Sequence, residues 1–177
     1  MFKFISIALI AIVVPVAAIL VYASTKPDAF HVERSISIKA LPEKIFPHIN
    51  DFRLWDAWTP YNKDPAMKKL YSGKDSGKGA HYAWEGNKDV GKGDITIADT
   101  VPPNKLIFDL HMIEPFEGRN VATISLNRSG DFTNVTWSLD DKHSLMLKTV
   151  ALLIDLNQAI GKDFEVGLSR LKTIAEK

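Results

Sequence analysis

The chain begins with an apolar segment unlike the alternating pattern that follows it. Residues 4–23 contain no charged side chain, and the composition changes abruptly at Ser24. At about 1.5 Å of rise per residue, a helix of this length matches the roughly 30 Å of hydrocarbon in a bilayer. We therefore predict an N-terminal transmembrane anchor or signal over residues 1–25, a linker over residues 26–29 and one folded domain over residues 30–177.

A cleaved secretory signal is the alternative interpretation of the same segment. Such signals normally have an apolar stretch of roughly 7–15 residues and a small-x-small cleavage site. The residues before Ser24 are an imperfect version of that site, and Lys3 in a short N-terminal flank favours a cytoplasmic N-terminus. We expect a single-pass membrane protein whose domain lies on the outer side, facing the periplasm or an equivalent compartment, or a secreted protein if residues 1–23 are cleaved.

Strand-like alternation, turn residues and helical periodicity follow one another in the rest of the chain. Apolar and polar residues alternate over residues 30–40 and predict a strand. A helix that begins with a proline follows from Leu41, and a second short helix or tight loop covers residues 51–55. Six further strand candidates, separated by turn chemistry, cover residues 67–71, 80–85, 94–100, 105–113, 119–127 and 133–140. One apolar face then predicts a single long C-terminal helix, whose first part, residues 145–156, is apolar almost all round.

Charge and cysteine content exclude several classes of function. The chain has 22 Lys and Arg against 21 Asp and Glu, and Lys3 is the only charge before Lys26, so the domain is neutral overall. Nucleic-acid binding, which needs clustered positive charge, is not expected. The absence of cysteine excludes disulfides, thiolate catalysis and cysteine-based metal sites. The five histidines lack ligand spacing, so we expect no metal and no cofactor.

The order of elements and several local motifs resemble one superfamily over nearly all of residues 30–175. The motifs include RSISI at 34–38, PEKIF at 42–46, WDAWTP at 55–60, YAWEGN at 82–87 and IGKDFEVGL at 160–168. This ordered set is similar to START-like proteins of the SRPBCC type, often described as polyketide cyclase/dehydrase-like. The resemblance implies an α+β helix-grip fold, in which a curved antiparallel sheet of about seven strands wraps a long C-terminal helix and leaves a cavity between them.

Strand alternation indicates which side chains face that cavity. Within residues 105–113, one face is entirely apolar and the other carries Asp109 and His111, which we assign to a solvated convex face. The other strands divide in the same way, so the interior should have few polar groups. The residues that we expect to line the cavity or its mouth are Trp55, Trp58, Tyr61, Tyr82, Trp84, Ile95, Ile97, Phe108, Leu110, Met112, Trp137, Ile160 and Phe164.

We therefore expect a membrane-tethered domain that binds a hydrophobic small molecule, such as a lipid, an isoprenoid or a polyketide-like compound. No catalytic residue is predicted, and no oligomeric state. One alternative is a cyclase or dehydrase acting on a polyketide-like or aromatic substrate, with its reactive groups at the mouth among Asp56, Tyr61, Glu85, Asn87 and Glu114. Another is an envelope protein-interaction module with an exposed apolar patch around residues 145–153.

Overall fold

The computed structural model describes residues 2–142 and 144–177, with side chains described from residue 13 onward. Two compact units divide the chain. The first comprises the chain up to Phe30 together with Lys142–Leu156, and the second comprises His31–Asp141 together with Asn157–Lys177. The second unit contains nearly all of the predicted domain.

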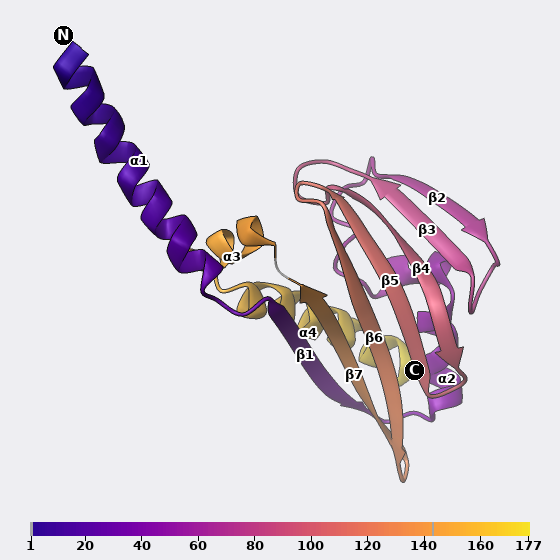
Figure 1. The fold of residues 1–177 in the computed structure, drawn as a ribbon. Coiled ribbons are helices and arrows are strands. Elements are labelled where there is room, and N and C mark those ends of the chain that lie inside the picture. The colour runs from indigo at the N-terminus through magenta and orange to yellow at the C-terminus, as the bar shows by residue number, and fades with distance from the viewer. Residues whose placement is uncertain (1, 143) are drawn as a thin grey trace. The chain divides into compact units, whose positions relative to one another are not determined.

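The first unit contains two helices, α1 (Phe2–Ser24) and α3 (Leu145–Ala151) (Figure 1). Ser144 caps α3, since its hydroxyl accepts a hydrogen bond from the backbone nitrogen of Leu147 at 3.3 Å. The Lys148 side chain is buried and pairs with Asp28. Among the described residues, no helix is both long enough and apolar enough to cross a membrane, and residues 4–12 of the predicted span lie outside the described side chains.

The second unit is built on a single seven-stranded sheet, with the order β1-β7-β6-β5-β4-β3-β2. The strands are β1 (Ala29–Ile38), β2 (Lys68–Gly73), β3 (Ala80–Glu85), β4 (Lys92–Val101), β5 (Lys105–Glu114), β6 (Gly118–Ser129) and β7 (Phe132–Lys142). From β2 to β7 each strand pairs antiparallel with the next along the chain. All seven predicted strands are confirmed, with boundary shifts of up to two residues.

Three helical segments complete this unit: α2 (Pro42–Asn50), the 3₁₀ segment η1 (Phe52–Ala57) and α4 (Leu156–Ala175). The prediction of one continuous C-terminal helix is wrong. The chain turns after α3, where the backbone nitrogens of Leu152 and Leu153 bond three residues back. Asp155, a residue type favoured at helix N-caps, stands directly before α4.

Helix α4 packs against the sheet through one apolar face (Figure 1), with Phe164, Leu168 and Leu171 almost completely buried. Gly167 lies where the helix approaches Trp137 most closely. A Cβ atom at this position would stand only 2.9 Å from the Trp137 ring. The glycine therefore lets the indole lie directly against the helix.

Candidate ligand-binding site

The inner face of the sheet, which packs on α4, becomes more accessible toward one end. On β5, Leu106 and Phe108 are completely buried, whereas Leu110 and Met112 are only partly buried. The strand register places this more accessible end where β7 finishes, near the start of α4. We call it the open end.

Aromatic rings fill the deeper part of the space between the sheet and α4. Trp137 stacks on Phe164 with ring centroids 4.2 Å apart and meets Trp58 edge-on at 5.3 Å. Trp58 meets Trp55 at 5.5 Å, and Trp55 meets Phe108 at 5.5 Å. A ligand would therefore have to lie beside this aromatic layer, toward the open end.

Tyr61 lies at the edge of the aromatic layer. Its ring meets that of Trp137 at 6.3 Å, and 40% of the residue's surface is accessible. Desolvation raises the pKa of Tyr61, and the charge of Asp163 adds to this shift. Tyr61 therefore presents accessible aromatic surface beside the buried rings.

A second phenol, Tyr82, stands toward the open end of β3. Its ring stacks on those of Tyr71 and Trp84, with centroids 5.1 and 5.7 Å away. Desolvation raises the pKa of Tyr82, and interactions with Tyr71 and Asp56 contribute further. Asp56 itself accepts two hydrogen bonds of 2.6 Å from the Lys69 ammonium group. The surroundings of Tyr82 thus favour a neutral hydroxyl and oppose negative charge.

Two further carboxylates of this unit are paired. Asp163 of α4 pairs with Lys63 at 3.5 Å. Asn120 shares the inner face with Leu110, and its amide nitrogen, oriented toward Asp141, donates to both carboxylate oxygens at 2.7 and 3.0 Å. The open end therefore combines apolar and aromatic side chains with a rim of paired polar groups.

The predicted cavity residues fall into two groups. The residues buried in the core are Trp55, Trp58, Tyr82, Ile95, Ile97, Phe108, Trp137 and Phe164. The residues that keep accessible surface are Tyr61, Trp84, Leu110, Met112 and Ile160. Trp55 and Trp58, which we expected at the cavity or its mouth, lie in the core. The indole nitrogen of Trp55 donates to the backbone carbonyl of Ile49, and that of Trp58 donates to the carbonyl of His48, so both polar groups are satisfied inside the protein. Contact of any of these residues with a ligand stays a prediction.

The five residues named for the enzyme alternative do not converge on one point. Glu85 faces the outer side of β3, where hydrogen bonds from two lysines lower its pKa. Asn87 lies in the turn after β3, and Glu114 is exposed at the end of β5. Among the five, Asp56 bonds to Lys69 of β2, and Tyr61 lies against Trp137 at the edge of the aromatic layer. A phenol with a raised pKa can donate a hydrogen bond but is a weaker proton donor than an ordinary tyrosine.

The outer face of the sheet carries a cluster of polar side chains, as the alternation predicts. His111 pairs with Asp94 at 3.2 Å, and His81 approaches the same carboxylate at 3.5 Å. Asp109 stays exposed, and an open hollow of about 420 Å³ adjoins these residues. The part of the chain that the structure describes holds no group of three or more side chains suited to a metal ion.

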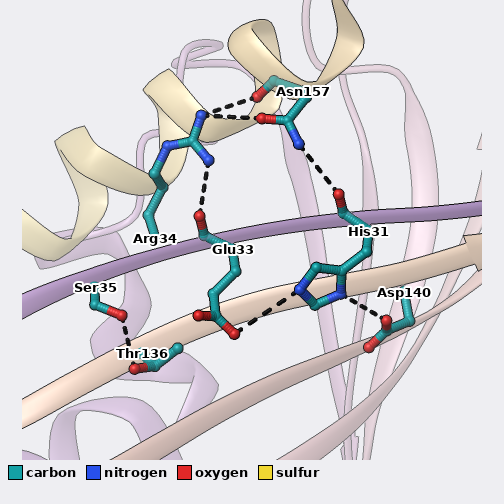
Figure 2. A network of polar contacts seen from close by, with 7 residues as sticks. All are labelled: His31, Glu33, Arg34, Ser35, Thr136, Asp140 and Asn157. Carbon is teal, nitrogen blue, oxygen red and sulfur yellow. Dashed lines mark hydrogen bonds and ion pairs between the residues drawn. The ribbon is translucent and has the colours of Figure 1, made fainter.

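A polar network that the sequence analysis missed joins β1 to the start of α4 (Figure 2). Arg34 points from β1 to α4 and donates to Asn157 Oδ1 at 3.2 Å. It also donates to Glu165 Oε1 at 2.8 Å. The Asn157 side chain donates in turn to the carbonyl of His31 at 3.1 Å. The signal was present in the sequence, because Arg34 interrupts the apolar positions Val32 and Ile36. The network fixes the start of α4 against β1.

Solved structures of similar fold cover most of the chain. The protein CV1439 from Chromobacterium violaceum matches with a TM-score of 0.60 and 13% identity, over 86% of this chain and 99% of its own. The Aha1 dimer from Colwellia psychrerythraea matches with a TM-score of 0.60 and 19% identity, over 83% and 96%. DynU16, a protein in the dynemicin biosynthetic locus, matches with a TM-score of 0.56 and 16% identity, over 86% and 48%. At these identities the likeness shows the fold alone.

A comparison with curated proteins finds no match. The family model described as polyketide cyclase / dehydrase and lipid transport matches residues 29–176, which is most of the chain. The architecture is the one expected from the resemblance, with an α+β arrangement, a seven-stranded sheet and a C-terminal helix packed on it. The chain therefore belongs to the polyketide cyclase/dehydrase and lipid transport family.

Proposed function

We propose that this protein binds a hydrophobic small molecule at the open end of the inner face, beside the aromatic layer. The observation that carries the proposal is the change of burial along the inner face of β5, where Leu106 and Phe108 are completely buried and Leu110 and Met112 keep accessible surface. Trp84 offers further accessible apolar surface on the same face. Removing such surface from water contributes about 25 cal/mol per Å², so shape and apolar area would dominate the affinity.

Membership of the family and the place of DynU16 in a biosynthetic locus support a lipid, isoprenoid or polyketide-like ligand. A binding domain needs accessible apolar surface and few reactive groups, and the inner face meets both conditions. A cyclase would instead need an acid or base within reach of the substrate. The five named candidates do not converge on one point of the inner face, so binding is the better supported function.

Equilibrium binding of the neutral fluorophore N-phenyl-1-naphthylamine to the full chain, held in amphipol, tests this proposal. A Met112→Trp substitution would fill the open end, whereas Leu70→Trp adds the same bulk on the outer face of β2, where Leu70 is 65% exposed. We expect one site per chain, a loss of at least tenfold in affinity for Met112→Trp, and no change for Leu70→Trp. Equal binding by all three proteins would overturn the proposal.

We also propose that the apolar N-terminal segment tethers the domain to a membrane with the domain on the outer side. The uncharged run over residues 4–23 and the exposed apolar side chains of α1, such as Val14 and Val21, support a lipid environment for this helix. A tether would concentrate the domain where an apolar ligand is already dissolved. After alkaline extraction of cells, the intact chain should stay in the membrane fraction and a chain lacking residues 1–25 should not. Release of the intact chain would refute the tether.

A further inference from the structure

We propose that a second element of the first unit, the exposed apolar surface of α3 and of the turn after it, inserts into the interfacial layer of the membrane that holds α1. This surface consists of Leu145, Met146, Leu153 and Ile154, and we call it the α3 patch. The inference rests on the proposed tether and adds a second contact between the protein and the lipid bilayer.

The α3 patch presents large apolar side chains to solvent. Leu153 is 86% exposed, the largest fraction among the exposed large hydrophobic residues of the described chain. Met146 and Ile154 are 59% and 53% exposed, and Leu145 is 46% exposed. Several such side chains within one short segment mark an interaction surface, and the sequence analysis considered a protein partner for it.

The polar side chains of the same segment are already bonded inside the first unit. Lys148 is the one charged residue of the segment 144–154, and its side chain is buried and pairs with Asp28. The hydroxyl of Thr149 donates to the backbone carbonyl of Leu145 at 2.8 Å. The segment therefore presents apolar surface without an exposed charge.

The backbone of the segment is bonded internally as well. Ser144 accepts a hydrogen bond from the backbone nitrogen of Leu147. At the other end, the backbone nitrogens of Leu153 and Ile154 donate to the carbonyl of Val150 at 2.9 and 3.0 Å. Internal bonding of this kind suits contact with lipid, because hydrocarbon offers neither a donor nor an acceptor.

The contact between α3 and α1 favours lipid over protein as the partner. The two helices pack on each other within the first unit (Figure 1). Among the described side chains of α1, Ala23 is the one that is buried, and it ends the uncharged run. The α3 patch therefore belongs to a unit whose packing contact lies where an apolar helix leaves the hydrocarbon.

The residues beside Ala23 are typical of a membrane surface. The ammonium group of Lys26 donates to the hydroxyl of Tyr22 at 2.9 Å and lies 4.4 Å from the centre of its ring. Tyrosine is enriched where a membrane meets water, and lysine near a helix end extends its charge toward that layer. A protein interface would ordinarily carry hydrogen bonds, for which residues 144–154 leave few polar groups.

Fluorescence quenching in phosphatidylcholine vesicles tests the inference on the full chain. The chain has no cysteine, so Leu153→Cys supplies a single site for the fluorophore NBD, and the quencher is a lipid with a nitroxide high on its acyl chain. Interfacial helices bury their apolar face about 5–10 Å deep, so we expect this lipid to lower the NBD emission about threefold. The matched label at Leu70→Cys, a 65% exposed position of the second unit, should keep its emission.

A charge within the patch provides a second test. In the labelled Leu153→Cys protein, Met146→Asp should restore most of the quenched emission, because a carboxylate in an apolar layer is costly. The control Phe132→Asp changes an apolar residue that is 44% exposed in the second unit, and it should leave the quenching unchanged. Thermal unfolding of each variant identifies any loss of fold.

A label at Val14→Cys in α1 separates this inference from the tether. Quenching at Val14→Cys without quenching at Leu153→Cys would overturn the inference and leave the tether intact. Quenching at neither position would overturn both. A blue-shifted emission at Leu153→Cys that the nitroxide lipid does not quench would show that a second copy of the chain covers the patch, which would also overturn the inference.

Discussion

The same substitution, glycine to alanine, should have different effects on stability at two positions of α4. A Cβ at Gly167 would stand 2.9 Å from the ring of Trp137 and 3.3 Å from Pro60. The Trp137 ring is 4% exposed and stacked on Phe164, so it has no space to move. A Cβ at Gly161 would instead overlap the guanidinium of Arg34, which is the far end of a flexible side chain.

The magnitudes follow from these two environments. Replacing glycine by alanine inside a helix raises the free energy of unfolding by about 0.8–1 kcal/mol. The substitution reduces the conformational freedom of the unfolded chain equally at both sites. Overpacking a rigid core costs about 1–3 kcal/mol, so Gly167→Ala should destabilise the protein by about 1 kcal/mol. Displacing Arg34 from Glu165, whose side chain is 60% exposed, costs less than about 1 kcal/mol. Gly161→Ala should therefore be close to neutral.

Urea unfolding of the full chain, followed by tryptophan fluorescence, measures both variants. We expect Gly167→Ala to be less stable than Gly161→Ala by about 1 kcal/mol, which corresponds to about 3 °C in the melting temperature. In an Arg34→Ala background, Gly161→Ala should become stabilising by about 1 kcal/mol because the obstacle is gone. Equal stability of the two single variants would refute the packing of Trp137 against α4.

Other consequences can be measured directly. The hydroxyl of Thr133, which is completely buried, donates to the carbonyl of Ala40 at 2.7 Å, so Thr133→Val should lower the free energy of unfolding in urea by about 1–3 kcal/mol. The partly exposed Thr136 provides the matched control, Thr136→Val. Equal losses of stability in the two variants would contradict a stabilising role for the buried hydrogen bond. The raised pKa values of Tyr61 and Tyr82 mean that the unfolded chain loses these protons first, so stability should hold up to about pH 10 and fall above it. Ultraviolet titration should show Tyr61 and Tyr82 ionising at higher pH than Tyr22, whose pKa the neighbouring Lys26 lowers. A single titration step for all four tyrosines would contradict the desolvation of Tyr61 and Tyr82.

The periodicity of the chain predicted the sheet well because each strand has one apolar face. Leu106 and Phe108 are buried and Asp109 is exposed, as alternation requires. Alternation failed at a β-bulge between Ile97 and Asp99, which moves Thr100 opposite Leu106 and onto the inner face. No local pattern marks that bulge. Strict alternation from Ile95 and Ile97 would instead leave Thr100 on the outer face.

The site was harder to predict than the fold. The apolar character of Trp58 and Met112 indicated that both side chains face inward. It did not show that Trp58 is completely buried while Met112 stays accessible. That difference depends on how far each strand position lies from the open end, which is set by the register of the whole sheet. The position of Arg34 between Val32 and Ile36 indicated an unusual residue on the inner face of β1. Its partners Glu165 and Asn157 could not be predicted, since they lie more than one hundred positions away in the chain.

Native mass spectrometry of the full chain, released from amphipol before and after organic extraction, tests the central claim most directly. We expect a mass excess that corresponds to one apolar molecule per chain, removed by extraction and restored by a lipid extract. The Met112→Trp variant should lack this excess, and Leu70→Trp should keep it. A mass equal to that of the chain alone, with no uptake from the extract, would contradict the claim that the open end binds a hydrophobic ligand.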